Sequence, residues 1–368
     1  MTDLRVQDGS APRPGPGIAA RLALQPWFHR LCARVPGLSW ISRREGDALF
    51  EVVQGFVRSQ TLLALVELRV LHQLADGAAG LPALARDSGL APDRMAILLQ
   101  AGAALKLIHR RGDLWQLTAR GAAFLTVPGL EAMVRHHPVL YRDLADPVAF
   151  FRGETVPELA AFWPYVFGAG GAADPGLAAR YSRLMTDSQG LVAEDTLRLV
   201  SFRGIRHLMD VGGGTGAFLA AVARAHPQIS QTLFDLPAVV AGAVARPGLR
   251  VMPGSFRDDP LPAGADAISL IRVLYDHADA TVATLLRTVH DALPVGGRLI
   301  VSEPMSGGVR PDAATDVYFA VYTLAMQTGR TRSAAEIAAS CRTAGFQGIR
   351  THPGFRPFVT SAVTAMRG

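Results

Sequence analysis

A short apolar run that ends in an acid and a cluster of glycines constrains the fold of this chain more than any other stretch. Residues 208–216 read Leu-Met-Asp-Val-Gly-Gly-Gly-Thr-Gly. This pattern predicts a strand that ends at Asp210, a tight turn, and a helix that begins near Thr215. Glycine adopts positive φ and lets the backbone approach a ligand closely, and the first turn of a helix offers unpaired N–H groups. The stretch therefore predicts a ligand-binding turn at the carboxyl end of a strand.

Two kinds of ligand fit this turn. Gly212-x-Gly214-x-x-Ala217 satisfies the fingerprint of dinucleotide-binding turns, so a nicotinamide or flavin site is one interpretation. Asp210 argues against it, because a carboxylate there would repel a pyrophosphate and attract a positively charged ligand. S-adenosylmethionine carries a sulfonium and an ammonium group and no phosphate, and the glycines are spaced more tightly than a pyrophosphate turn requires. We therefore expect S-adenosylmethionine to be held by Asp210, Gly212, Gly213, Gly214 and Gly216.

A second acid lies at the spacing expected of a ribose-binding residue. Asp235 follows Gly212 by 23 residues, close to the separation of about 20 in nucleoside-binding βαβ units. Its carboxylate, followed in the chain by Leu236, can accept hydrogen bonds from both ribose hydroxyls; the alternative is a solvated loop acid. After the third predicted strand, Ser255 and Phe256 can flank an adenine, and Phe256 fits ordinary core packing equally well.

Alternating strand and helix patterns after residue 204 predict an α/β fold with a Rossmann-like, doubly wound and mainly parallel sheet. Strands are expected at 207–211, 231–235, 249–252, 267–271, 297–302 and 355–365. Helices between them are expected at 217–225, 237–245 and 280–293. Ligands bind at the carboxyl ends of the strands in such sheets, which is where the glycine turn lies.

The first 140 residues have a different, mainly helical sequence pattern. We expect a disordered tail over 1–17, an all-helical domain of winged-helix type over 18–140, and the sheet domain over 141–368. A long helix is predicted over 48–74, followed by helices at 81–88 and 93–105 and a hairpin at 107–117. Helix, helix and hairpin form a winged-helix pattern, which raises a ligand-sensing DNA-binding regulator as an alternative function. The second helix is apolar and small, so a dimerising role is favoured and no nucleic acid is expected as a partner.

Composition describes a globular chain, with 49% hydrophobic and 18% charged residues. It contains no apolar run long enough to cross a bilayer and no signal-peptide pattern, so a cytoplasmic location is expected. The net charge of +6 rests on scattered arginines, with Lys106 the only lysine, and this argues against a nucleic-acid surface. Cys32 and Cys341 are too far apart in sequence to suggest a metal cluster or a disulfide framework, so no metal is expected.

The stretch 24–34 mixes apolar and basic side chains at helical spacing. Trp27, Phe28 and Arg30 belong to it. An amphipathic helix of this kind suits peripheral contact with a membrane surface. Packing against a partner subunit or against the same domain is the plainer interpretation.

Several motifs together resemble one enzyme family. They are Asp-Val-Gly-Gly-Gly-Thr-Gly at 210–216, Phe-Asp-Leu-Pro at 234–237, and Ala-Leu-Pro-Val-Gly-Gly-Arg-Leu-Ile-Val-Ser-Glu at 292–303. With the winged-helix front half, they resemble the S-adenosylmethionine-dependent small-molecule O-methyltransferases of the caffeic acid and acetylserotonin type. The segments 270–277, 303–308 and 322–333 are more similar to the carotenoid 1-hydroxyl O-methyltransferases of phototrophic bacteria, which act on demethylspheroidene or hydroxyneurosporene. A related bacteriochlorophyll methyltransferase shares much of this pattern.

The resemblance implies a set of cofactor contacts and a homodimer whose front domains interlock. Gly212 and Gly214 would face the methionine moiety, Asp235 the ribose and Phe256 the adenine. Ser255 stands where the family usually has an acid. The remaining residues that the resemblance assigns to the cofactor are Met185 and Ser188, near the sulfonium, and Arg272.

The resemblance also reveals a departure at the catalytic base. Phenol-methylating members have a histidine where this chain has Tyr275; the first of the two acids that orient it is kept as Glu303, and the second matches Thr331. A tyrosine of pKa about 10 is a poor base near neutral pH but a good hydrogen-bond partner for a hydroxyl. Aromatic packing is the plainer role for Tyr275. His277 is an alternative base, although it is better interpreted as a loop or helix-cap residue.

A tertiary alcohol as acceptor would make sense of this departure, because such a hydroxyl is too weakly acidic to be deprotonated before methyl transfer. The rate would then depend on holding the oxygen in line in a dry site. We expect a long apolar pocket for a hydrophobic small molecule, beside an apolar helix over 317–326, although ordinary core packing explains that helix as well. A phenol, a polyketide and a tetrapyrrole remain alternative acceptors. The expected pocket residues are Phe319, Tyr322, Met326 and Thr331.

Overall fold

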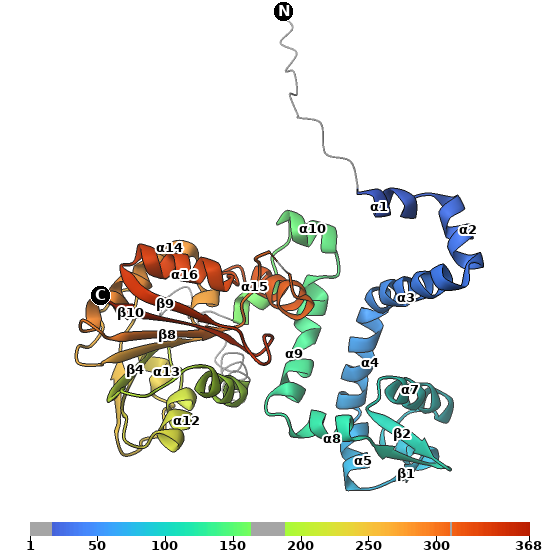
Figure 1. Ribbon diagram of the computed structural model, residues 1–368. Coiled ribbons are helices and arrows are strands. Elements are labelled where there is room, and N and C mark those ends of the chain that lie inside the picture. Colours follow the sequence, from blue (N-terminus) through green and yellow to red (C-terminus); the bar gives the residue numbers. More distant parts are fainter. Residues whose placement is uncertain (1–16, 163–187, 310) are drawn as a thin grey trace, which may run out of the picture.

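The structure is a computed structural model that describes residues 17–162, 188–309 and 311–368. The predicted tail over 1–17 and the predicted cofactor contact Met185 lie outside the described residues, apart from Gly17. The described chain has two parts (Figure 1): a mainly helical front part and an α/β part built on a large sheet.

The large sheet has seven strands in the order β6-β5-β4-β7-β8-β10-β9. The first five are parallel, and β10 and β9 are antiparallel to their neighbours. Residues along β7 are buried throughout, as expected for a strand covered on both faces. The strands are β4 (His207–Val211), β5 (Ser230–Asp235), β6 (Leu249–Pro253), β7 (Ala267–Ile271), β8 (Arg298–Glu303), β9 (Phe346–His352) and β10 (Ser361–Arg367).

Five of the predicted strands are confirmed within two residues, whereas the strand predicted over 355–365 is confirmed only from residue 361, where β10 begins. The chain forms β9, a loop and then β10. Pro353 and Pro357 interrupt any strand between them, because proline lacks the N–H that a ladder needs. Strand β9 lies at the sheet edge and is largely exposed, so it lacks the apolar run by which the buried strands were found.

Helices cover both faces of the sheet, which confirms the doubly wound α/β fold. On one face α14 (Asp279–Ala292) and α16 (Ala334–Thr343) pack against the strands through Val282, Leu286 and Ile337. On the other face α12 (Ala217–Ala225), the short α13 (Pro237–Val240) and the helical residues 188–199 pack on the sheet. Helix α13 is shorter than predicted.

The front part has its own core and contains a small sheet. Strands β1, β3 and β2 form a three-stranded sheet, because Ala79 and Gly80 pair with Trp115 and Leu114. The hairpin predicted over 107–117 is confirmed as β2 and β3, so the front domain is mainly but not entirely helical, and the winged-helix assignment stays a prediction. The elements are α1 (Ile18–Ala23), α2 (Pro26–Arg34), α3 (Pro36–Val53), α4 (Gly55–Glu67), α5 (Val70–Asp76), β1 (Ala79–Gly80), α6 (Leu81–Asp87), α7 (Pro92–Ala104), β2 (Ile108–Arg111), β3 (Leu114–Leu117), α8 (Ala119–Thr126) and α9 (Leu130–Asp143).

The long helix predicted over 48–74 is wrong, because the chain bends twice there. Helices α3 and α4 meet at Gln54 with a bend of 53°, next to Gly55, a poor helix former. Arg69 has a φ of 55° and separates α4 from α5. No single described helix is long and apolar enough to cross a membrane; α3 and α4 pass that test only as a bent pair.

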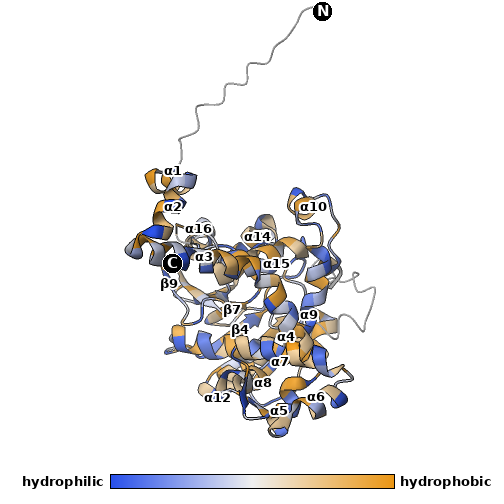
Figure 2. Cartoon of the chain, turned by 90° about the vertical axis from the view of Figure 1, so that its right-hand side faces the viewer, coloured by the Kyte–Doolittle hydropathy of each residue, from blue (hydrophilic) through white to orange (hydrophobic). Residues whose placement is uncertain are grey.

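The first helices contain many apolar residues (Figure 2), and several of their side chains are exposed. In α3 and α4 these include Phe50, Val53, Phe56 and Val57, each about half exposed or more. Several large apolar side chains exposed on consecutive helices are typical of an interaction site.

Helix α15 lies where the two parts meet (Figure 1), and two further short elements contact it. The three elements are η3 (Leu274–Asp276), the π-helical η4 (Ala313–Phe319) and α15 (Ala320–Met326). Helix α15 contacts α9, η3 and the short helix η1 (Glu158–Phe162). The helix predicted over 317–326 is confirmed, with its first turns in η4. Helix α10 (Pro147–Arg152) follows α9.

Candidate active site

The glycine turn connects β4 to α12 and leaves one side open. Gly212, Gly214 and Gly216 have φ values of 69°, 62° and 85°, a region that favours glycine. Gly213 has no room for a side chain, because a Cβ there would lie 2.5 Å from Asp210 Oδ2. A Cβ at Gly214 would meet nothing within 4 Å. The turn thus covers Asp210 closely and faces open space at Gly214.

Asp210 is a buried acid with half of its carboxylate satisfied. Its Oδ1 accepts a hydrogen bond of 2.6 Å from Ser269 Oγ, whereas its buried Oδ2 has no hydrogen-bond partner among the described residues. Burial raises the pKa of Asp210 to about 7. A positively charged ligand group near Oδ2 would stabilise the ionised form. The arrangement fits the ammonium of S-adenosylmethionine and not a pyrophosphate.

Asp235 and the glycine turn lie together at the ends of β5 and β4. Asp235 Oδ2 accepts a hydrogen bond of 2.7 Å from the Gly214 N–H, and Oδ1 accepts one of 2.7 Å from the Leu236 N–H. Burial raises the pKa of Asp235 to about 6, against the effect of these two bonds. The sequence spacing of Gly212 and Asp235 predicted one shared nucleoside site, and in the structure Asp235 is hydrogen-bonded directly to the glycine turn.

Phe256 follows β6 and is half-buried, with its ring against the sheet core. Its ring lies 5.2 Å from that of His277 in an edge-on arrangement. The Ser255 N–H donates to Asp259 Oδ2 at 2.8 Å, and Ser255 Oγ donates to Asp258 Oδ2 at 2.9 Å. The family resemblance predicts an acid before the aromatic residue Phe256. This chain has Ser255 there, and Ser255 is hydrogen-bonded to two acids that follow it, Asp258 and Asp259.

Tyr275 lies in η3, just beyond the end of β7. Arg272 takes a left-handed conformation there, with a φ of 59°, and its Nε donates to Tyr275 Oη at 3.2 Å. Its Nη1 donates to Ser188 Oγ at 2.8 Å. Burial raises the pKa of Tyr275 above its usual value, so the phenol stays neutral. The structure thus brings together three predicted site residues, Ser188, Arg272 and Tyr275.

Glu303 supports this turn from the end of β8. Its Oε2 accepts hydrogen bonds from the N–H groups of Leu274 (2.9 Å) and Tyr275 (3.3 Å). Its Oε1 is buried and has no hydrogen-bond partner among the residues that the structure describes. Burial raises the pKa of Glu303 to about 7. Asp276, which sequence reasoning missed, has a similarly unbonded buried Oδ1, and burial raises its pKa strongly.

His277 is the C-cap residue of η3. Its Nδ1 lies 3.0 Å from Arg257 Nη2, and its ring packs on Phe256. Burial, with smaller effects of Arg257 and Arg332, lowers the pKa of His277 to about 4. The helical turn removes the period-two arrangement that would put Tyr275 and His277 on one side, and it confirms His277 as a cap residue.

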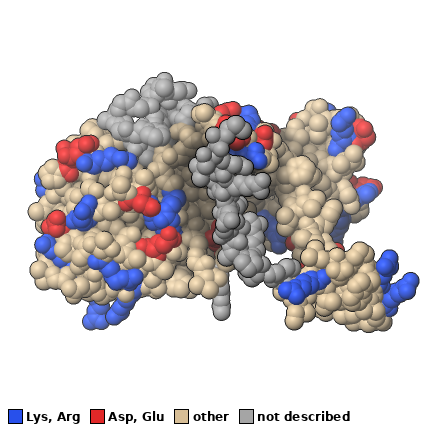
Figure 3. All heavy atoms as spheres, turned by 90° about the horizontal axis from the view of Figure 1, so that it is seen from above, with Lys and Arg blue, Asp and Glu red and all other residues tan. Residues whose placement is uncertain are grey.

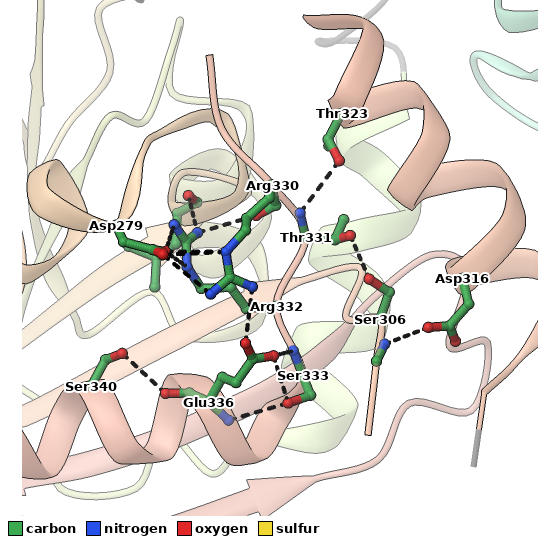
Figure 4. Close-up of polar contacts among 12 residues, drawn as sticks. Asp279, Ser306, Asp316, Thr323, Arg330, Thr331, Arg332, Ser333, Glu336 and Ser340 are labelled. Carbon is green, nitrogen blue, oxygen red and sulfur yellow. Dashed lines mark hydrogen bonds and ion pairs between the residues drawn. The ribbon is translucent and has the colours of Figure 1, made fainter. Parts of the chain in front are cut away.

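A buried arginine holds η3 in place (Figure 4). Arg332 donates from Nη1 to the Leu274 carbonyl and from Nη2 to the His277 carbonyl, both at 2.8 Å. Its Nε and Nη2 also donate to Asp279 Oδ1, at 2.9 and 2.6 Å. Only 2% of the Arg332 side chain is exposed. No sequence motif indicated this residue, because its partners are backbone carbonyls more than 50 residues away.

The four predicted pocket residues divide into two kinds. Phe319 and Tyr322 are half-buried and lie on η4 and α15, where Tyr322 Oη is 3.0 Å from Nε2 of His136. Met326 is fully buried where α15 packs on α9 and η1. Thr331 is buried as well, and its hydroxyl bonds to that of Ser306 (Figure 4). Met326 and Thr331 thus support the wall behind the half-buried pair.

The described residues contain no group of three or more His, Cys, Asp or Glu side chains that could hold a metal ion. On the face seen in Figure 3, small groups of basic side chains are separated by uncharged surface and, over much of the face, by acidic side chains. This distribution is unlike the continuous basic surface that nucleic-acid binding needs.

Two family models match this chain. An O-methyltransferase domain matches residues 141–347, and an O-methyltransferase dimerisation domain matches residues 50–127. This chain belongs to the O-methyltransferase family. It is 63% identical to demethylspheroidene O-methyltransferase of Cereibacter sphaeroides, covering 95% of this chain and 94% of that protein. It is 59% identical to the enzyme of the same name from Rhodobacter capsulatus, covering 98% and 93%.

Solved structures have the same fold. Human N-acetylserotonin methyltransferase, solved in complex with S-adenosylmethionine, gives a TM-score of 0.73 at 24% identity, covering 88% of this chain and 98% of that one. The predictions of the family and of an S-adenosylmethionine-dependent O-methyltransferase are thereby confirmed, and the dimerisation domain supports the predicted homodimer. This family assignment replaces the two alternative interpretations, a nicotinamide-dependent enzyme and a DNA-binding regulator.

Proposed function

We propose that the protein transfers a methyl group from S-adenosylmethionine to the tertiary hydroxyl of a hydroxycarotenoid of the demethylspheroidene or hydroxyneurosporene type. The observation that carries this proposal is the high identity, over nearly the whole chain, to two demethylspheroidene O-methyltransferases. Tyr275 supports it, because a neutral buried phenol suits an alcohol whose proton leaves late.

The donor would lie on the glycine turn. Asp210 would meet its ammonium group, Gly212 and Gly214 its methionine backbone, and Asp235 its ribose. The fit rests on the unbonded Oδ2 of Asp210 and on the open side of Gly214. When bound, S-adenosylmethionine supplies a methyl group already activated by the sulfonium charge. The protein then has to position the acceptor oxygen in line and keep water out.

The acceptor hydroxyl would be aimed by the turn that carries Tyr275. The Tyr275 hydroxyl accepts from Arg272 and so keeps its own proton available to the acceptor oxygen. Glu303 accepts hydrogen bonds from N–H groups of this turn, and Arg332 donates hydrogen bonds to its carbonyls. Phe319 and Tyr322 would line the apolar passage for the polyene.

An activity assay tests this function. The purified protein is incubated with methyl-labelled S-adenosylmethionine and with a tertiary 1-hydroxycarotenoid, N-acetylserotonin or a bacteriochlorophyll precursor, each presented in the same detergent micelles. We expect label in the carotenoid at a kcat/KM at least tenfold above that for the others. Preferred methylation of the phenol or the tetrapyrrole would overturn the carotenoid proposal and leave the family assignment unchanged.

The hydrophobic acceptor suggests that the protein works as a cytoplasmic, peripheral membrane protein. Helices α1 to α3 expose Trp27, Trp40 and Ile41 beside several arginines, and Arg44 lies over the Trp40 ring at 5.8 Å. Aromatic rings interspersed with cations suit the surface of an anionic bilayer.

Sedimentation with vesicles containing anionic lipid tests this location. We expect the full chain to bind and a variant lacking residues 1–47 to lose binding. Retained binding of the truncated variant would contradict the membrane role. Unchanged binding combined with loss of the dimer would assign these helices to the subunit interface instead.

A further inference from the structure

Two parallel histidine–tyrosine pairs join α9 to η4 and α15. His136 Nε2 lies 3.0 Å from Tyr322 Oη, and His137 Nε2 lies 2.8 Å from Tyr318 Oη. The two tyrosine rings stack, 5.9 Å apart and inclined by 17°. All four side chains are half-buried. Neighbouring histidines thus each bond to one member of a tyrosine stack on the opposite element.

Only one of the pairs lies beside the proposed acceptor site. Helix α15, which carries Tyr322, also contacts η3. The pKa of Tyr322 is affected by charges on this turn, those of Arg272 and Asp276, and by the phenol of Tyr275. The pKa of Tyr318, in η4, is raised by burial and by Tyr141 of α9 instead. Of the two pairs, the His136 pair is thus the one whose tyrosine lies on the helix that contacts the turn carrying Tyr275.

Methylation of an alcohol releases a proton that some group must take. Tyr275 is a poor acceptor, because burial raises its pKa, and its hydroxyl is bonded to Arg272. His277 is turned toward Arg257 and Phe256. Burial, aided by the neighbouring His137, lowers the pKa of His136 to about 4, so its imidazole is neutral. Although this weakens it as a base, the imidazole is still far more basic than the oxygen of the protonated ether that forms as the alcohol oxygen is methylated.

We propose that His136, acting through the hydroxyl of Tyr322, takes up the proton of the acceptor alcohol during methyl transfer. A lone pair of the acceptor oxygen forms the O–CH₃ bond, and the S–CH₃ bond of the sulfonium donor breaks with its electron pair left on sulfur. The hydroxyl proton passes to Tyr322 Oη while Tyr322 gives its own proton to His136 Nε2. The half-buried imidazolium then releases the proton to solvent. This inference rests on the proposed function, because it concerns a weakly acidic alcohol.

Variants of the two pairs test this relay in the full-length protein. His136→Gln can keep a hydrogen bond to Tyr322 but cannot take up a proton, and Tyr322→Phe removes the intermediate hydroxyl. We expect each to lower kcat on the hydroxycarotenoid by about 10²-fold, the low end of general-base contributions. The acceptor KM and the affinity for S-adenosylhomocysteine should change less than threefold. The double variant should lose no more than the single ones, since they interrupt one path.

His137→Gln and Tyr318→Phe are the matched controls, because they break the same kind of bond between the same elements. Their kcat should stay within threefold of the wild type. Imidazole added to His136→Ala should restore at least a tenth of the wild-type kcat and should not raise that of His137→Ala. Binding of S-adenosylhomocysteine identifies variants that are folded.

The outcomes separate this inference from the proposed function. A wild type that fails to methylate the hydroxycarotenoid overturns the proposed function. An active wild type with a His136→Gln variant within threefold of it overturns the relay alone. Equal losses in the His136 and His137 variants without imidazole rescue would assign both pairs to packing, and would also overturn the relay.

Discussion

Replacing Arg332 by methionine tests whether this buried guanidinium holds the catalytic turn. Methionine has no donor and ends where the guanidinium begins, so it removes the hydrogen bonds and also leaves the space of the buried guanidinium unfilled. The His277 carbonyl would lose its side-chain donor inside the protein. The Leu274 carbonyl would keep the His277 N–H at 3.1 Å as a partner.

The expected loss follows from these two carbonyls. An orphaned buried carbonyl costs about 1–3 kcal/mol, and a lost hydrogen bond from a charged donor costs about 1.5–3 kcal/mol. The ion pair with Asp279 adds less than about 1 kcal/mol, because the Asp279 side chain is 65% exposed. From these polar contacts alone we expect Arg332→Met to lower the free energy of unfolding by about 2.5–7 kcal/mol. Its kcat should fall as well, since η3 carries Tyr275.

Urea unfolding at one protein concentration, followed by circular dichroism, measures this loss. Arg330→Met is the matched control, because Arg330 binds the same Asp279 and also Glu336 but is 48% exposed (Figure 4). The control should cost less than about 1 kcal/mol. Equal losses in the two variants would refute the argument that buried carbonyls, rather than the ion pair, give Arg332 its importance.

Three further predictions concern the donor site and the turn. Asp210 has a pKa of about 7 in the free protein and must ionise to bind an ammonium group, so affinity for S-adenosylhomocysteine should rise about tenfold from pH 6 to pH 8. Calorimetry should show this rise in the wild type and no such rise in Asp210→Asn. The same pH dependence in Asp210→Asn as in the wild type would contradict the assignment. Tyr275→Phe should lower kcat about 10- to 100-fold, the equivalent of one hydrogen bond near a charge; unchanged kcat and KM would exclude the positioning role. Gly213→Ala should destabilise the protein by about 1–3 kcal/mol in thermal unfolding, because its Cβ overlaps Asp210 Oδ2. The control Gly46→Ala, in an open helical position, should be neutral or stabilising.

Local patterns predicted the sheet well because each buried parallel strand is itself a continuous apolar run. The strands β4 and β7 match their predicted bounds. The failures occurred where tertiary context decides the conformation. Strand β9 is exposed at an edge, and the helix expected over 48–74 breaks at Gln54 and Arg69 without a proline to announce it.

The sequence by itself determined the donor turn. Asp210, the glycines and Asp235 belong to one βαβ unit, and parallel strands bring the ends of β4 and β5 together, so spacing along the chain translates into contact. The substitution of Tyr275 for a histidine was likewise visible in the sequence, through the family resemblance.

Only the tertiary structure decided what surrounds the acceptor site. Arg332 reaches the carbonyls of η3 from 55 to 58 residues away, and His136 meets Tyr322 across 186 residues. No period or motif relates such positions, because their contact depends on how α9, α15 and η3 pack. Elements with a local pattern can be read from the sequence, whereas side chains that meet between separately folded elements require the packed molecule.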